Sequence, residues 1–273
     1  MAKKEKDFFG ARITLYLFIF IFFWWSYLQI FKTDDFSVQN QIFGGTYWLL
    51  ALCGGLSGLY ISRKWGGLGS VMGKAITFLS FGLLGQVFGQ VSYSLYTFFF
   101  KVEIPYPSFG DIGFISSLIF YIIGLLYLAK ATGAILSLKN VSKIFLALLI
   151  PLVMLTLSYF LFLKGYEFDW TNPLKVILDF GYPLGETIYI SLALLIFILS
   201  RGILGGIMKS KIVLILFAFF IYFLADYSFL YFSYYGSLHP AGWNDIVYAF
   251  AYYFMSISLF ELLNVYYEIK KLQ

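Results

Sequence analysis

The sequence contains little charge and almost no cysteine or histidine. Only 12% of its 273 residues are charged, against roughly 25% in soluble domains. A soluble fold of this length needs more polar surface than these residues provide. Cys53 is the single cysteine and His239 the single histidine, so the sequence offers neither an intrachain disulfide nor a Cys- or His-rich metal site.

Several catalytic and cofactor patterns are missing as well. The chain has no Ser-His-Asp arrangement, no glycine-rich loop that would cradle a phosphate, and no lysine within the seventh hydrophobic run for a retinal Schiff base. The alternation of polar and apolar residues that is typical of membrane β-strands is also absent. We therefore expect no cofactor and no metal, and the residue patterns favour a protein that is not an enzyme.

Long hydrophobic runs are what the sequence does contain. Hydrophobic residues make up 61% of the chain and the mean hydropathy is +0.84, while a helix needs about 20 apolar residues to cross a bilayer. The first run is too long for a signal-peptide core and no small-residue cleavage site follows it. We predict an all-α, polytopic membrane bundle over residues 13–265, with tails at 1–12 and 266–273. The eight predicted spans are Ile13–Phe31, Ile42–Ser62, Ala75–Phe100, Ile112–Leu128, Ile144–Leu163, Tyr182–Ser200, Ile212–Tyr235 and Ile246–Val265.

The basic residues predict the orientation of these spans. Both termini and every second connection carry 15 of the 19 lysines and arginines, and only Lys32, Lys101, Lys164 and Lys175 lie on the opposite side. The positive-inside rule then places both termini in the cytoplasm of a multi-pass plasma-membrane protein. The net charge of +5 is explained by this topology and by anionic lipids, so the bilayer is the expected partner and nucleic acid is not.

The chain contains an internal repeat of helical hairpins. The segment from Gln90 to Asp111 parallels the segment from Asp226 to Asp245: a polar residue within an outward-running helix, a short Pro/Gly loop, and an acid that begins the inward-running helix. A third, partial copy is Gly181-Tyr182-Pro183-Leu184-Gly185-Glu186. The repeat predicts hairpins at spans 3–4, 5–6 and 7–8.

These motifs carry a resemblance to a known class of proteins. Pro105-Tyr106-Pro107-Ser108-Phe109-Gly110-Asp111, Tyr182-Pro183-Leu184-Gly185-Glu186 and Gly242-Trp243-Asn244-Asp245 follow one another in the chain. In this order they resemble motifs of the multi-span N-terminal sensory region of bacterial diguanylate cyclases and phosphodiesterase-type signalling proteins. Those proteins continue into a cytoplasmic output domain, whereas this sequence ends at Gln273. The resemblance therefore implies a sensor that signals through a separate cytoplasmic or membrane partner.

A second, weaker similarity leads to the eight-span lysoplasmalogenases. Their intramembrane aspartates do not map onto this chain, which has Gln86 and Gln90 in the third span. This similarity would imply an intramembrane lipid hydrolase that uses Asp226 and Asp111 as an acid–base pair. A structural subunit of a larger membrane assembly is the third hypothesis.

Asp226 is the most informative of the candidate site residues. It lies deep within the seventh run, where an unpaired carboxylate is costly and indicates function. The alternative is a structural role, in which a protonated Asp226 forms an interhelical hydrogen bond with a tyrosine or a glutamine. We expect a polar chamber around it that opens to the exterior and takes a small molecule or a cation. The full set of candidate ligand-binding residues is Asp226, Gln90, Asp111, Glu186, Asp245, Gln86, Tyr227 and Tyr182.

Structural roles compete with these functional ones. Asp111, Glu186 and Asp245 are each predicted to begin an inward-running helix, where a carboxylate caps free amides and interacts favourably with the helix dipole. Gln86 and Gln90 share one face of the third span with Gly82, Gly85 and Gly89. This pattern predicts close packing against another helix.

Overall fold

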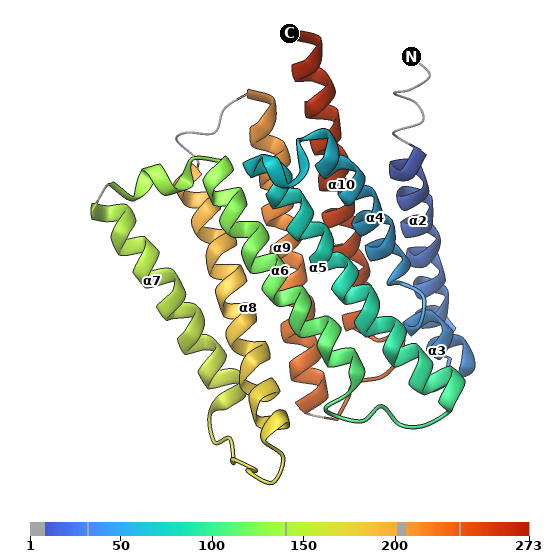
Figure 1. Ribbon diagram of the computed structural model, residues 1–273. Coiled ribbons are helices and arrows are strands. Elements are labelled where there is room, and N and C mark those ends of the chain that lie inside the picture. Colours follow the sequence, from blue (N-terminus) through green and yellow to red (C-terminus); the bar gives the residue numbers. More distant parts are fainter. Residues whose placement is uncertain (1–8, 32, 140, 201–205, 235, 273) are drawn as a thin grey trace.

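The structure is a computed structural model that describes residues 9–31, 33–139, 141–200, 206–234 and 236–272. These residues form a bundle of helices without a strand (Figure 1). Most of the predicted N-terminal tail lies outside the described residues, as does Arg201. The α-helices are α2 (Phe9–Ile30), α3 (Val38–Gly44), α4 (Leu49–Lys64), α5 (Val71–Ser94), α6 (Phe109–Ala131), α7 (Val141–Ser158), α8 (Pro173–Ser200), α9 (Gly206–Tyr234) and α10 (Trp243–Leu272). Shorter helical segments are η1 (Gly67–Gly69), η2 (Leu95–Phe100), η3 (Ala134–Lys139) and η4 (Tyr159–Leu163).

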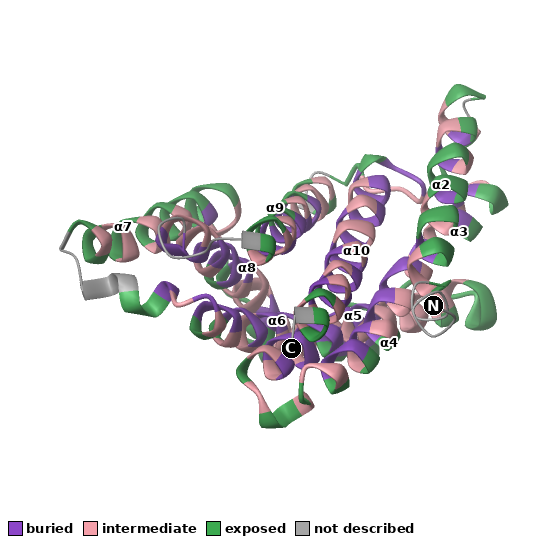
Figure 2. Cartoon of the chain, turned by 90° about the horizontal axis from the view of Figure 1, so that it is seen from above, coloured by how far each residue is buried: buried purple, intermediate pink, exposed green. Residues whose placement is uncertain are grey.

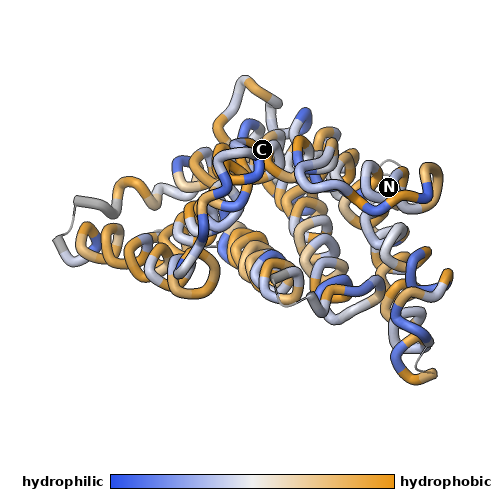
Figure 3. The backbone as a smooth tube through the Cα atoms, turned by 90° about the horizontal axis from the view of Figure 1, so that it is seen from below, coloured by the Kyte–Doolittle hydropathy of each residue, from blue (hydrophilic) through white to orange (hydrophobic). Residues whose placement is uncertain are grey.

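The described residues contain eight helical segments that are long and apolar enough to cross a membrane. This confirms the predicted fold class and number of spans. The second span, Val38–Lys64, is interrupted because α3 and α4 are separated by a turn in which the Trp48 indole donates a hydrogen bond to the Gly45 carbonyl at 2.7 Å. Hydrophobic residues dominate the helices, and hydrophilic residues lie mostly in the connections and at the C-terminal end (Figure 3).

The sixth span begins earlier than predicted. We expected it at Tyr182, but α8 begins at Pro173 and continues through Pro183. The Asn172 side chain caps the first turn by accepting a hydrogen bond from the Lys175 amide at 3.2 Å. Lys175 and Asp179 interrupt the hydrophobic run and concealed this part of the helix, while an internal proline is tolerated inside a membrane bundle.

Six helices form a closed ring. Around it, α4 packs against α5, α5 against α6, α6 against α8, α8 against α9, α9 against α10, and α10 against α4. The other two spans lie outside, α2 against α10 and α4, and α7 chiefly against α8. Figure 2 shows α2 and α7 at opposite ends of the bundle. The inner faces of six helices therefore converge on one central region.

The two described ends of the chain lie on the same side of the bundle (Figure 1). An even number of crossings requires this arrangement. The connections from α2 to α3, from α5 to α6, from η4 to α8 and from α9 to α10 lie on the opposite side, which we call the outer side following the charge pattern.

Glycines allow α5 and α6 to approach each other closely. A Cβ atom built on Gly113 of α6 would lie 2.6 Å from both the Gly85 carbonyl oxygen and the Gly89 amide nitrogen of α5. These are backbone atoms that cannot rotate away. The predicted close packing of the glycine face of α5 is therefore confirmed, and its partner is α6.

Candidate functional site

A cluster of tyrosines fills the centre of the ring. We call it the central tyrosine cluster; it comprises Tyr47, Tyr121, Tyr189, Tyr222, Tyr248 and Tyr252, all of them buried. Tyr222 of α9 connects the group, with ring centroids 5.3 Å from Tyr121, 5.8 Å from Tyr189 and 6.0 Å from Tyr248. Aromatic rings at these separations stabilise one another. Their hydroxyl groups supply hydrogen-bond donors deep inside the membrane region.

Asp226 lies against this cluster and is fully enclosed. The residue is 7% exposed. It lies about 12 Å along the helix from the outer end of α9, at 1.5 Å per residue. Tyr189 donates a hydrogen bond to Oδ2 and Tyr248 donates one to Oδ1, each at 2.8 Å. Tyrosine hydroxyls therefore contact both carboxylate oxygens, and the chamber expected to open at Asp226 stays a prediction.

Glu186 is located differently from the prediction. It does not begin a helix, because α8 begins at Pro173, which places Glu186 about 20 Å along the helix axis. Helix capping therefore cannot explain this acid. Glu186 lies one turn before Tyr189 on the same face of α8, and its carboxylate interacts electrostatically with Asp226. Among the described residues, Glu186 Oε2 has no hydrogen-bond partner.

Asp111 caps α6, as its spacing from Ser108 predicts. Asp111 Oδ2 accepts hydrogen bonds from the Ser108 amide at 2.6 Å and the Ser108 hydroxyl at 2.9 Å. The other oxygen, Oδ1, accepts a hydrogen bond from the Tyr182 hydroxyl of α8 at 2.6 Å. Asp111 and Tyr182 thus form one contact, which joins α6 to α8 near the outer side.

Asp245 fixes the loop between α9 and α10. Its Oδ2 accepts a hydrogen bond from the Ala241 amide at 2.8 Å, and the Tyr47 hydroxyl lies close to the same carboxylate. Gln90 donates to the Tyr47 hydroxyl at 3.0 Å. Two predicted site residues, Gln90 and Asp245, therefore meet through a tyrosine that the prediction did not include.

Ala241 holds this loop against α2. Ala241 has a positive φ of 59°, which is strained for a residue with a Cβ atom. Its carbonyl accepts hydrogen bonds from the Trp25 indole and the Gln29 amide, both at 2.9 Å. These contacts and the bond to Asp245 keep the strained residue in place.

Gln86 links the cluster to the α5–α6 packing surface. It donates to the Ser117 hydroxyl at 2.8 Å and accepts from the Tyr252 hydroxyl at 3.0 Å. Tyr227, the last predicted site residue, packs its ring against Phe162 with centroids 4.9 Å apart, and its hydroxyl lies near Thr187 and Glu186. The predicted residues thus surround one core, although Asp226 and Gln86 contact different tyrosines.

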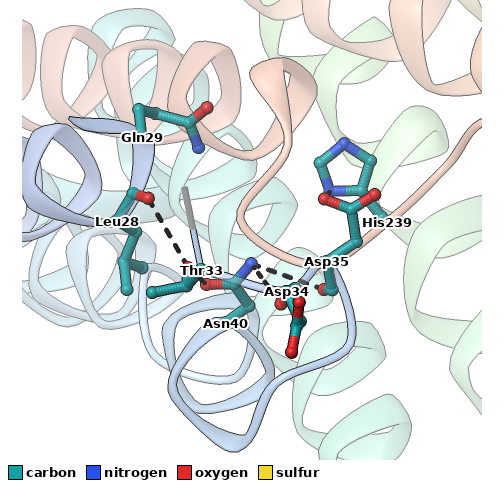
Figure 4. Close-up of a pocket in the computed structure, with 7 residues that line it drawn as sticks. All are labelled: Leu28, Gln29, Thr33, Asp34, Asp35, Asn40 and His239. Atoms are coloured by element: carbon teal, nitrogen blue, oxygen red, sulfur yellow. Dashed lines mark hydrogen bonds and ion pairs between the residues drawn. The ribbon is translucent and has the colours of Figure 1, made fainter. Parts of the chain in front are cut away.

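A polar cavity opens on the outer side (Figure 4). It has a volume of about 360 Å³ and is lined by Leu28, Gln29, Thr33, Asp34, Asp35, Asn40 and His239. The His239 ring nitrogen Nδ1 lies 3.7 Å from Asp35 Oδ1, across the two loops that form the cavity. His239 also interacts electrostatically with Asp245. The cavity is therefore next to the buried network but is not lined by Asp226.

Asp179 repeats the arrangement of Asp226 at the outer surface. Its two oxygens accept hydrogen bonds from Tyr106 at 2.7 Å and from Tyr166 at 2.6 Å. The hydrogen bond to the Asp179 carboxylate raises the pKa of Tyr166 to about 12, because the negative charge favours the neutral phenol. This group ties two outer loops to α8 and is separate from the central cluster.

Tyr189 and Tyr248 were missed in the sequence. They are two of many tyrosines, and nothing local distinguishes them from interfacial anchors. A weak signal was available for Tyr189, because it follows Glu186 by three residues and Tyr182 by seven, which places all three on one helical face. Tyr248 carried no comparable signal.

Together, the eight spans and the buried acid–tyrosine core define a multi-pass α-helical membrane protein. Comparison of the chain with protein-family models, curated proteins and solved structures finds no match. The described residues contain no group of three or more His, Cys, Asp or Glu side chains placed to hold a metal ion. The geometry of the site is therefore the basis for the function of this protein.

Proposed function

We propose that this protein is a membrane-embedded sensor or ligand-binding module of the plasma membrane that signals through a separate partner. The supporting observation is a path of neighbouring side chains, joined by electrostatic, hydrogen-bond and ring contacts, from the outer side to the middle of the ring. The path begins at His239 in the outer cavity and passes through Asp245 to Tyr47. Tyr47 stacks on Tyr248 with centroids 6.4 Å apart, and Tyr248 donates to Asp226.

The path also connects α9 to α10. Asp226 of α9 is bonded to Tyr248 of α10 at 2.8 Å. Nearer the cytoplasmic ends, Lys211 of α9 forms an ion pair with Glu261 of α10 at 2.5 Å. A small cation or amine in the outer cavity would change the charge beside Asp245 and alter the packing of this helix pair. The cytoplasmic ends of α9 and α10 are then the output of the sensor.

The geometry favours sensing over lipid hydrolysis. An acid–base pair of Asp111 and Asp226 would need the two carboxylates within hydrogen-bond reach. Their partners Tyr182 and Tyr189 are seven residues apart on α8, a separation of about 10 Å along the helix. Asp111 accepts a hydrogen bond from Tyr182, whereas Asp226 accepts hydrogen bonds from Tyr189 and Tyr248. These separate partners do not support an acid–base pair.

Spin-label distance measurements test the proposal. Cysteines replace Ser210 and Glu268, exposed on the cytoplasmic parts of α9 and α10, in a Cys53→Ser background that removes the single native cysteine. Distances are recorded in nanodiscs with and without choline chloride or ethanolamine hydrochloride. We expect the α9–α10 distance distribution to change with at least one of these cations.

The matched control is Asp179→Asn, because Asp179 also accepts two tyrosine hydrogen bonds but lies outside the path. Asp226→Asn should abolish the response and Asp179→Asn should preserve it. A response that is the same in Asp226→Asn and in the unmodified protein removes Asp226 from the signalling path. Unchanged distances with both cations contradict the proposal.

A further inference from the structure

Three unpartnered oxygen atoms lie together at the contact between α8 and α9. They are Glu186 Oε2, Thr187 Oγ1 and the Tyr227 hydroxyl, and none has a hydrogen-bond partner among the described residues. The three residues are 3%, 1% and 9% exposed. The Tyr227 hydroxyl lies beside the Ser158 and Thr187 side chains and interacts electrostatically with Glu186 and Asp226. Buried polar atoms are nearly always partnered in folded proteins, so three such neighbours indicate a binding site.

The charges at this site are unequal. Asp226 receives two tyrosine hydrogen bonds, which stabilise its negative charge. Glu186 receives none at Oε2, and neither carboxylate forms an ion pair with a lysine, arginine or histidine in the described parts of the chain. A carboxyl group in the membrane interior is stabilised by hydrogen bonds, by a proton or by a neighbouring positive charge. The described residues supply no lysine, arginine or histidine beside these two carboxyl groups.

We propose that Glu186, Thr187 and Tyr227 bind a monovalent alkali cation, with Asp226 as the neighbouring negative charge. One carboxylate oxygen and two hydroxyl oxygens are hard ligands suited to such an ion. A divalent ion fits less well, because no third acidic side chain joins the two carboxylates in the described residues.

This inference deepens the proposed function, because it names a resident ion for the buried end of the polar path. The ion would lie between α8 and α9, beside the bond from Tyr189 to Asp226. Its presence would hold the two helices together, and its loss would leave two carboxylates repelling each other. The state of the ion site would then be coupled to the α9–α10 contact.

Thermal unfolding in neutral-lipid nanodiscs tests the ion site. Midpoints are compared in sodium chloride, potassium chloride and N-methylglucamine chloride at equal ionic strength and pH. A ligand that binds only the folded state raises stability with the logarithm of its concentration above Kd. We expect the midpoint of the unmodified protein to rise with sodium or potassium over N-methylglucamine.

Two variants and a matched control assign the effect to the site. Glu186→Gln, which is nearly isosteric and uncharged, should abolish the alkali-dependent increase, and Thr187→Val should abolish or greatly reduce it. Thr156→Val is the control, because Thr156 is exposed on α7 and donates to the Leu152 carbonyl at 2.8 Å. It should keep the full increase.

Two results would overturn the cation site. The first is the loss of any link between alkali ions and Glu186: the unfolding midpoint is equal in all three salts, or its increase with alkali ions persists in Glu186→Gln. The second is a protein that responds to pH alone, with an infrared carboxylic-acid band that disappears in Glu186→Gln, because a proton is then the occupant. Either result leaves the α9–α10 distance measurement intact, so the ion site and the sensor proposal fail separately.

Discussion

Tyrosine hydroxyls replace cations as the partners of three acids in this protein. Asp226 receives two of them and Asp179 receives two, while Asp111 receives one from Tyr182. A phenol combines a large apolar ring with one donor. It can therefore accompany a carboxylate into an apolar interior, which explains how Asp226 is buried without a lysine or arginine beside it.

Removing one of these donors should destabilise the fold measurably. We expect Tyr248→Phe to lower the free energy of unfolding by about 1 to 2 kcal/mol, because hydrogen bonds to charged groups are stronger than the average interhelical bond in membranes. The loss should largely disappear in an Asp226→Asn background, since the charge is then absent. Reversible unfolding of the four proteins in mixed detergent micelles measures this coupling.

Tyr253→Phe serves as the control for this cycle. Tyr253 lies on the same helix, and its ring stacks on Phe18 with centroids 4.1 Å apart. Its substitution should change the unfolding free energy by less than about 0.5 kcal/mol. A loss for Tyr248→Phe no larger than for this control would show that the bond to Asp226 contributes little to stability.

Sequence reasoning at the residue scale succeeded where the partners are local. The spacing of Ser108 and Asp111 predicted a cap that the structure contains. The partners of Asp226 lie 37 and 22 residues away, and that of Gln86 lies 166 residues away. No local pattern distinguishes such tyrosines from their neighbours, because tertiary packing alone brings them together.

At the scale of elements, the contact of α5 with α6 depends on backbone atoms. We expect Gly113→Ala to destabilise the protein by about 1 to 3 kcal/mol, the usual cost of overpacking. The added methyl group would meet the Gly85 carbonyl and the Gly89 amide at 2.6 Å. Thermal or detergent-induced unfolding of the purified variant measures the loss.

Gly181→Ala provides a matched helical control. The nearest atom to a Cβ built there is a methyl carbon of Ile115 at 3.6 Å, which is an ordinary contact. Alanine favours helix over glycine by about 1 kcal/mol, so this variant should be neutral or slightly stabilised. Equal destabilisation of both variants would show that the cost is unrelated to the α5–α6 contact.

Element boundaries were predictable where hydropathy changes at a cap and were missed where it does not. The start of α6 fits its serine cap and acid, whereas α8 extends nine residues before the predicted start at Tyr182. The proline at position 183 was interpreted as a helix start, although it lies inside the helix. This error also misplaced Glu186, whose position in mid-helix is central to the ion site.

At the scale of the whole molecule, orientation determines which side meets a ligand. In a Cys53→Ser background, single cysteines at Glu103 and Asp169 should react with a membrane-impermeant maleimide in intact cells. A cysteine at Leu68, exposed between α4 and α5, should react only after permeabilisation. The reason is the excess of basic residues in the connections on the side of the termini. The reverse pattern would place the polar cavity in the cytoplasm and contradict sensing from outside.

The number of spans followed from hydropathy, but the ring did not. Hydrophobic runs predict how many times the chain crosses a membrane, but they do not predict which helices contact one another. The closure of the ring by α4 and α10, which are distant in sequence, depends on contacts such as that of the Ser256 hydroxyl with the Leu50 carbonyl at 3.0 Å. These contacts create the enclosed core that the sequence indicated only through Asp226.

The peripheral position of α7 has a mechanical consequence. Only 6% of the apolar window of its span is buried, so most of this helix is available to the acyl chains of a bilayer. A change in bilayer thickness or lateral tension would therefore tilt α7 before it strained the ring. The Ser158 hydroxyl at the end of α7 donates a hydrogen bond to the Pro183 carbonyl of α8 at 3.4 Å, one turn from Glu186. This contact joins the outermost helix of the bundle to the helix that carries Glu186.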